Sequence, residues 1–185
     1  MYKRQILDDG YKDNSSELVG VHSPSGPFKG NKYSAFEGAT RVPFIFYWDQ
    51  HIQPAVSNAL VSQVDFLASF ASLIGYDMSE EQSVIDSENH LDVFLGKKKR
   101  ARDYLLEESY TLNIRHKQWK FVKGVKKVPS WIKEEKGIDS GLSLDDKLFR
   151  LDQDSTESTN VIDRYPQIAL ELKTQLDKIT QKKMQ

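Results

Sequence analysis

The spacing of apolar positions changes along the chain, and each change predicts a different element. Residues 42–48 are nearly all apolar, which predicts a strand buried on both faces, as in the middle of an α/β sheet. Residues 56–75 predict the main helix, with apolar positions 64, 67, 68, 71 and 74 on one face and 66, 70 and 73 on a second. Ser62-Gln63-Val64-Asp65 fits a capping box, and Gly75 fits a C-terminal stop. We therefore expect a helix that is buried on most sides.

The second half of the chain predicts short strands and a final helix. Leu112 and Ile114 alternate with polar residues, and so do Trp119 and Phe121 after a turn at 116–118, which indicates a hairpin with one apolar face. Further strands are expected at 104–107 and 147–151. Pro166 suits the first turn of a helix whose apolar face repeats at positions 168, 172, 176 and 179. We expect this helix to pack on a small antiparallel sheet, and residues 77–103 to form a polar connection in which His90 is a surface residue.

Composition narrows the function classes. The chain has 185 residues, enough for one domain with a sizeable core. Its 26 basic and 27 acidic residues give a net charge of −1, which argues against a nucleic-acid partner and favours a solvated loop for the basic run Lys97–Arg100. The absence of cysteine excludes disulfides and thiolate metal sites. No apolar run approaches the roughly 20 residues of a membrane-spanning helix.

Candidate chemistry lies in the loop that precedes the first apolar run. The loop holds Gly26, Gly30 and Gly38, which allow close backbone approach, and it carries Lys29 and Lys32 three residues apart. A lysine is a compact charge suited to an anionic ester whose oxygens gain negative charge in the transition state. On composition alone, Lys32 is also compatible with a solvated turn, and His22 with a surface loop.

The order and spacing of residues in this loop resemble a known family signature. The matching residues are Gly26-Pro27-Phe28-Lys29-Gly30-Asn31-Lys32, then Phe36-Glu37-Gly38, then Thr40-Arg41-Val42-Pro43-Phe44. The pattern is similar to that of the type I sulfatases, in the alkaline phosphatase superfamily. Asn31 and Ala39 stand where the family has glycine. Weaker likeness extends over roughly residues 6–180.

The resemblance implies the C-terminal part of a sulfuric ester hydrolase acting on sulfated carbohydrate. The implied fold class is an α+β fragment of an α/β sulfatase fold. Residues 1–76 would form the edge of the large central sheet, 77–103 a connection, and 104–185 a small four-stranded antiparallel subdomain with a terminal helix. Lys32 would be catalytic, contacting the sulfate group and the departing oxygen, and His22 would lie by the substrate cleft. Lys29 is expected to pair with an acidic side chain.

Other parts of such an enzyme are expected outside this sequence. The family uses a formylglycine nucleophile and Ca²⁺, but His22-Ser23-Pro24-Ser25-Gly26 is out of register with the nucleophile motif. Asp8-Asp9 fits a turn better than a calcium site. Met1–Gln5 have no counterpart in the resemblance, so we expect an upstream part of a parent chain to carry the nucleophile, the calcium ligands and the signal peptide of a periplasmic or secreted enzyme. The chain alone is expected to be inactive.

Several alternatives stay open. Glu37 and Arg41 flank the apolar run and are expected to be members of structural ion pairs, since a buried charge must be paired. Trp131 is compatible with stacking on a sugar ring and with plugging the edge of the core. The competing functions are a phosphatase or phosphodiesterase of the same superfamily, a non-catalytic carbohydrate-binding module, and a structural partner domain. The first of these normally uses zinc held by aspartate and histidine, and no Asp-x-x-x-His pattern is present.

Overall fold

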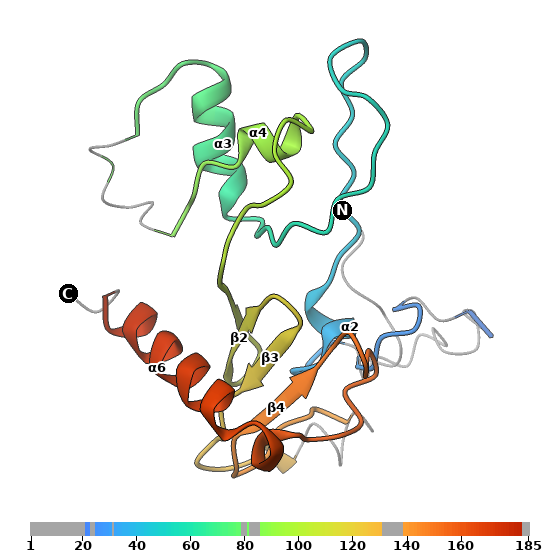
Figure 1. The fold of residues 1–185 in the computed structure, drawn as a ribbon, viewed down its shortest axis with the longest axis vertical. Helices are drawn as coiled ribbons and strands as arrows, with labels where there is room; N and C mark the ends of the chain where they lie inside the picture. The colour runs from blue at the N-terminus through green and yellow to red at the C-terminus, as the bar shows by residue number, and fades with distance from the viewer. Residues whose placement is uncertain are drawn as a thin grey trace. The chain divides into compact units, whose positions relative to one another are not determined.

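The computed structural model describes residues 21–22, 25–30, 32–78, 81, 86–130 and 139–182. These residues form two compact units (Figure 1). One unit lies within residues 44–105. The other combines the described residues up to 43 with those from 106 to 182. The domain boundaries expected after residues 76 and 103 refer to a whole enzyme and stay a prediction.

The larger unit is built on a four-stranded sheet. Its strands are β1 (Leu105–Glu108), β2 (Leu112–His116), β3 (Trp119–Val122) and β4 (Lys147–Arg150), adjacent in that order. β2 pairs with β3, and β3 with β4, in antiparallel register. A 3₁₀ turn, η2 (Ile162–Arg164), leads into the terminal helix α6 (Pro166–Lys182). The predicted small sheet with a terminal helix is confirmed, with β1 one residue later than expected.

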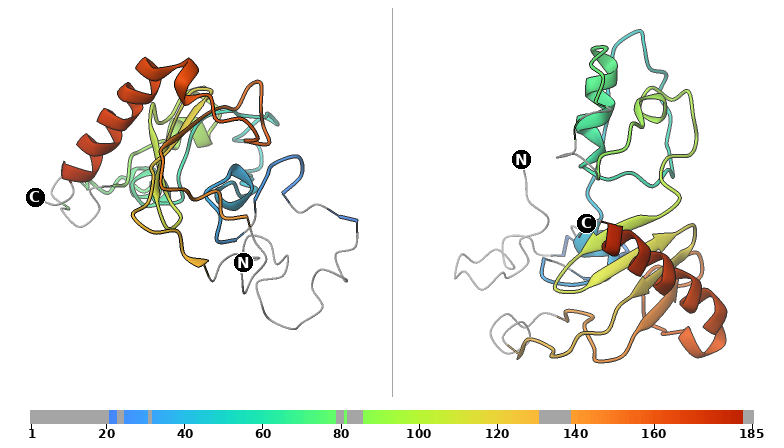
Figure 2. Two further views of the ribbon diagram at one scale, coloured as in Figure 1. Left: turned by 90° about the horizontal axis from the view of Figure 1, so that it is seen from below. Right: turned by 90° about the vertical axis from the view of Figure 1, so that its left-hand side faces the viewer.

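Helix α6 covers one face of this sheet (Figure 2). Ile114 is the register partner of Phe121, and Phe121 of Leu148, so the three side chains share that face and all are buried. Leu172 and Leu176 of α6 are buried as well. The apolar stripe predicted for this helix therefore packs on β2 and β3, as expected.

The loop that carries the family signature, residues 25–41, covers the opposite face of the sheet; it is called the lysine loop below. Arg115, Lys120 and Phe149 are register neighbours on that face. Phe36 of the loop packs in one cluster with Ala35, Val122 and Phe149. The loop continues into the short helix α2 (Glu37–Thr40), which the sequence did not predict. The predicted hairpin of β2 and β3 is confirmed. The expectation that it has only one apolar face was wrong, because every residue of β3 is buried between α6 and the loop.

The smaller unit contains helices α3 (Asp65–Leu73) and α4 (Leu91–Phe94). The Asp65 carboxylate accepts the Ser62 N–H at 2.8 Å, which is one half of the predicted capping box. At the other end Gly75 has φ 74°, its N–H donates to Ser72 O at 3.2 Å, and Tyr76 N–H donates to Ala71 O at 2.8 Å. This Schellman motif confirms Gly75 as the stop. The helix is shorter than the predicted 56–75.

Two expectations for this unit were wrong. Residues 42–48 do not form a strand, and Ile45 and Tyr47 are 87% and 80% exposed. Leu67 and Ile74 of the α3 region are also exposed, so the helix is not buried on most sides. A doubly buried strand needs neighbours across both faces, and the exposure of Ile45 and Tyr47 shows that the described residues leave one side of this run open. Within residues 77–103, which were expected to form a polar connection, the structure has the short helix α4.

The apolar run is partly held by aromatic packing. Phe44 lies 5.0 Å from Phe66 and 5.4 Å from Phe94, ring centroid to centroid, and Phe46 lies 5.8 Å from Phe94 and 6.1 Å from Phe70. Such pairs add about 0.5–1.5 kcal/mol each beyond area burial. These rings tie residues 44–46 to both helices of the smaller unit.

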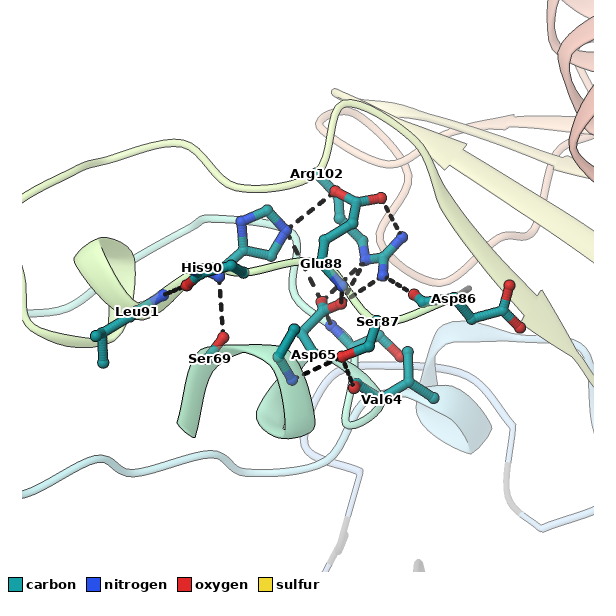
Figure 3. Close-up of polar contacts among 12 residues, drawn as sticks. Val64, Asp65, Ser69, Asp86, Ser87, Glu88, His90, Leu91 and Arg102 are labelled. Carbon is teal, nitrogen blue, oxygen red and sulfur yellow. Dashed lines mark hydrogen bonds and ion pairs between the residues drawn. The ribbon is translucent and has the colours of Figure 1, made fainter. Parts of the chain in front are cut away.

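A buried carboxylate organises the rest of the smaller unit (Figure 3). Asp65 is fully buried, and both its oxygens accept from the Arg102 guanidinium, through Nε at 2.9 and 3.1 Å. Arg102 also pairs with Glu88 at 2.6 Å and donates to Asp86 O at 2.5 Å. Burial raises the pKa of Asp65, but the hydrogen bonds from Arg102 and from two backbone N–H groups lower it by a larger amount. The pKa of Asp65 is therefore below its ordinary value. The Nε2 atom of His90 lies 3.2 Å from a Glu88 carboxylate oxygen, and the His90 side chain is only 12% exposed. The expectation of a surface histidine was therefore wrong.

Candidate functional site: the lysine loop

The lysine loop, residues 25–41, is fastened to the larger unit at both polar and apolar points. Lys29 Nζ lies 2.9 Å from an Asp139 carboxylate oxygen and 4.3 Å from the centroid of the Phe36 ring. Ala35 N–H donates to Ser140 O at 2.8 Å. The predicted ion pairing of Lys29 is confirmed, and it joins the loop to the segment before β4.

Two glycines allow the loop to fold back on itself. Gly38 N–H donates to Lys29 O at 2.8 Å. A Cβ atom at Gly38 would lie 2.4 Å from Gly30 O and 2.6 Å from Lys29 O, so no larger residue fits there. Gly30 has φ 90°, a conformation that side chains disfavour. The spacing of these glycines brings the two ends of the loop into contact.

Lys32 lies between these two glycines, next to a pair of tyrosines. It is partly buried, and its Nζ lies 5.0 Å from the centroid of the Tyr33 ring. Tyr33 lies 6.3 Å from Tyr110, and both residues have positive φ, 75° and 57°. Positive φ is uncommon for bulky residues. Ser109 Oγ donates to Ser34 O at 2.7 Å, so the β1–β2 connection is bonded to the loop beside Lys32.

His22 lies at an exposed turn. The roles given to His22 and Lys32 stay predictions. Asp8, Asp9 and Trp131 lie outside the described residues. Within the described ranges, no group of three or more His, Cys, Asp or Glu side chains is arranged to hold a metal ion. The calcium ligands that the resemblance implies are therefore not found in the described part of this chain.

A buried lysine lies under the loop. Lys120 is fully buried, and its Nζ lies 3.1 Å from Glu37, 3.4 Å from Glu107 and 3.5 Å from Glu157. Burial lowers the pKa of Lys120, but the three carboxylates raise it more, so the ammonium stays charged. One cation from β3 is thus shared by α2, β1 and the segment after β4.

Glu37 is the loop's contribution to this cluster. Its second oxygen lies 3.0 Å from an Arg115 nitrogen and 3.7 Å from Arg41 Nε. Glu37 is 1% exposed, so its charge is neutralised by side chains rather than by water. The expectation that Glu37 and Arg41 are members of structural ion pairs is confirmed.

Glu157 completes the cluster from the turn after β4. One of its carboxylate oxygens accepts the backbone N–H of Glu37 at 2.6 Å. Burial raises the pKa of Glu157 from the ordinary 4.5 to about 7, although Lys120 and the Glu37 N–H act in the opposite direction. A buried acid therefore holds the first residue of α2.

Sequence reasoning missed Lys120, Glu107, Arg115 and Glu157. In an alternating strand, Lys120 was expected on the solvent side. Lys120 lies in Trp119-Lys120-Phe121, within the range of the family resemblance, and that position was the available signal for a role of Lys120. The alternation of apolar and polar residues does not indicate that the second face of the strand is also buried.

Comparisons with known proteins find sulfatases among the relatives of this chain. A family model described as Sulfatase matches residues 12–76, which include the lysine loop. N-acetylgalactosamine-6-O-sulfatase of Bacteroides thetaiotaomicron is 35% identical over 178 residues, which make up 94% of this chain and 34% of that protein. An arylsulfatase of Hemicentrotus pulcherrimus is 35% identical over 107 residues, 50% of this chain and 19% of that protein.

A solved structure gives the same result for the fold. The structure, from work on glycosaminoglycan metabolism by Bacteroides thetaiotaomicron, has a TM-score of 0.86 and 34% identity, and it covers 94% of this chain and 36% of that chain. The fold of this chain is therefore similar to part of that solved structure. The chain is a sulfatase-like segment, and it spans about a third of the curated relative that it matches over most of its length.

Proposed function

We propose that this chain is the C-terminal part of a sulfatase that hydrolyses sulfate esters on carbohydrate. The observation that carries the proposal is the lysine loop: buried charges hold its residue Glu37 against the sheet, and Lys32 lies five residues before Glu37. A cation that must act on a developing charge needs a fixed position, because preorganised charge costs no reorganisation during the reaction. The identity with an N-acetylgalactosamine-6-O-sulfatase over 94% of the chain supports a 6-sulfated amino sugar as substrate.

In the proposed reaction Lys32 stabilises negative charge on the sulfuryl oxygens and on the bridging oxygen as the S–O bond breaks. His22 contacts the sugar at the edge of the pocket. The family resemblance implies a formylglycine nucleophile and Ca²⁺, and we place both in sequence beyond this chain. The chain alone then has no turnover. The resemblance also implies a periplasmic or secreted enzyme; within the described residues, no helix is long and apolar enough to span a membrane.

A panel of esters tests the proposed function. We would incubate the complete enzyme containing this chain with 6-sulfated N-acetylgalactosamine saccharides, their unsulfated forms and the matching phosphate esters. The proposal predicts release of inorganic sulfate from the first set and no phosphate release from the last. Faster release of phosphate than of sulfate would favour a phosphatase of the same superfamily. Binding without turnover in the complete enzyme would favour a carbohydrate-binding module.

A further inference from the structure

Glu157 connects the turn after β4 to the lysine loop. Its carboxylate accepts the Glu37 N–H at 2.6 Å and lies 3.5 Å from Lys120 Nζ. Glu37 opens α2, five residues after Lys32. The carboxylate of a residue 125 positions from Lys32 therefore helps to fix where the loop meets the sheet.

The turn that carries Glu157 is itself tightly held. Glu157 has φ 51°, in the left-handed region that a glutamate rarely adopts. The Asp154 carboxylate accepts the N–H groups of residues 158 and 159, each at 2.8 Å, and Asp154 O accepts the Glu157 N–H at 3.2 Å. Strained residues persist where the surrounding structure over-determines them, and such strain gathers at functional sites. In this conformation the Glu157 carboxylate accepts the N–H of the first residue of α2.

Glu157 belongs to a cluster of charged groups that come from several neighbouring elements. Lys120 of β3 faces Glu157 directly, at 3.5 Å. Glu37 of α2 and Glu107 of β1 pair with the same lysine, and Arg115 of β2 and Arg41 pair with Glu37. When Glu157 is ionised, three carboxylates surround the Lys120 ammonium. When it is protonated, the cost of burying its charge is removed, which is the largest cause of its raised pKa, and so is its repulsion with Glu37. These two gains outweigh the lost attraction to Lys120, and an oxygen can still accept the Glu37 N–H. The attachment of the loop should therefore be tighter below neutral pH than above it.

We propose that Glu157 is a positioning residue for Lys32: it holds the first N–H of α2 and so fixes the loop on which Lys32 lies. This inference rests on the proposed function, in which Lys32 stabilises charge in the transition state. A displaced cation weakens an interaction made mainly in the transition state, so the loss should appear in kcat more than in KM.

The test compares Glu157→Ala and Glu157→Gln in the complete enzyme. We expect Glu157→Ala to lower kcat by about 10- to 100-fold, since misplacement by about 1 Å can cost that much, with KM changed less than about threefold. Glu157→Gln keeps an oxygen acceptor and should retain most of kcat. It should also abolish the part of the decline in kcat above pH 7 that comes from ionisation of Glu157.

A double variant asks whether Glu157 acts through Lys32. If it does, Lys32→Ala/Glu157→Ala will be no slower than Lys32→Ala alone, because the two losses are coupled rather than additive. The matched control is Asp146→Ala, which removes another carboxylate that accepts a backbone N–H, that of Gly124 at 2.8 Å, and that pairs with a lysine, Lys173 at 2.6 Å. It should lower stability and leave kcat unchanged.

Hydrogen exchange of the amides of residues 37–39 gives a readout that does not depend on turnover. We expect exchange at least about tenfold faster in Glu157→Ala and near the wild-type rate in Glu157→Gln. Unchanged exchange, a wild-type kcat in Glu157→Ala, or additive effects in the double variant would overturn the positioning role. An enzyme that releases no sulfate would instead refute the proposed function, and the exchange result would still decide whether Glu157 holds the loop.

Discussion

At the scale of single residues, buried charge attaches the lysine loop to the sheet. Lys120 and Glu37 are both essentially without solvent contact, and each has partners from more than one element. Breaking a buried pair by removing one partner leaves an uncompensated charge and typically costs about 3–5 kcal/mol. Replacing either side chain should therefore be far more damaging than replacing an exposed ion pair such as Arg100–Asp103.

Glu157 predicts a pH dependence of stability. Its pKa is about 7 in the folded protein against an ordinary 4.5, so the folded state binds the proton more tightly than the unfolded chain. The stabilisation is complete below pH 4.5 and is lost as the pH rises through 7, up to about 3 kcal/mol. Urea titrations from pH 5 to pH 8 measure it. Glu157→Gln should flatten this dependence and Glu108→Gln, at an exposed glutamate, should not. An equal slope in both variants would contradict the assignment.

Gly38 predicts a steric limit in the loop. A Cβ atom there would overlap two backbone oxygens, of Gly30 and Lys29, neither of which can rotate away. Gly38→Ala should lower the free energy of unfolding by about 2 kcal/mol or more. Gly26→Ala is the control: it has positive φ but open space around it, so only the conformational cost of about 1 kcal/mol is expected. Equal losses, measured by urea denaturation, would argue against the close contact.

The residues of the loop were predictable from sequence only where a motif carries them. Lys29 was expected to form an ion pair from its position in the family motif, and Glu37 and Arg41 because they flank a run predicted to be buried. All three form ion pairs, although the run itself is not buried on both faces. The partners Glu107 and Glu157 were not predictable, because each comes from a distant segment. A contact between residues 37 and 157 depends on how the strands stack, which no local pattern encodes.

At the scale of elements, α6 is the helix whose apolar stripe, predicted from the sequence, packs on the sheet as expected. Leu172 and Leu176 are buried against the sheet, whereas Leu170 is 61% exposed on the same helix. Leu172→Ala should destabilise the larger unit by about 2–5 kcal/mol through lost contacts and a cavity. Leu170→Ala should change stability by less than about 0.5 kcal/mol, since it removes no buried contact. Similar effects of the two changes would show that α6 is not held by this stripe.

In the smaller unit, Asp65 links the start of α3 to Arg102. Asp65→Asn should destabilise this unit by about 3 kcal/mol or more, because it leaves the Arg102 guanidinium, 12% exposed, without its main partner. Hydrogen exchange of the α3 amides measures this locally. Asp103→Asn removes an exposed partner of Arg100 and should have almost no effect. Loss of protection in the larger unit by the same amount would contradict a local role.

Helices and strands were predicted well where the surface against which each of them packs is also part of this chain. The sheet and α6 cover each other, so alternation and helical spacing identified them. Residues 42–48 and the α3 stripe were predicted as buried from the same kind of pattern, yet Ile45, Leu67 and Ile74 are exposed. Apolar spacing indicates that a face needs covering; it does not say whether the cover lies within the same chain.

At the scale of the whole molecule, the described residues include an exposed apolar side of α3. A groove of about 660 Å³ runs along the helix, lined by Phe66, Leu67, Phe70, Ala71, Ile74 and Tyr76 among others. Apolar patches of this kind mark contact surfaces or aggregation sites. The chain spans 34% of the length of its bacterial relative, and we propose that the rest of such an enzyme covers this groove.

The groove predicts self-association of the isolated chain. Leu67→Lys and Ile74→Lys place charges on the exposed apolar side and should reduce light scattering and dye binding at equal protein concentration. Leu144→Lys is the control, since Leu144 is 67% exposed in the other unit. If all three changes reduce association equally, the effect comes from added charge rather than from the groove.

The central claim is that Lys32 acts on the sulfate group from a loop that the sheet holds in place. The most direct measurement is kcat for sulfate release by the complete enzyme with Lys32→Ala, beside Lys117→Ala, which removes an exposed lysine at the β2–β3 turn. The account predicts a fall of about 100-fold or more for Lys32→Ala and no change for Lys117→Ala. A fall of only a few-fold for Lys32→Ala would contradict it.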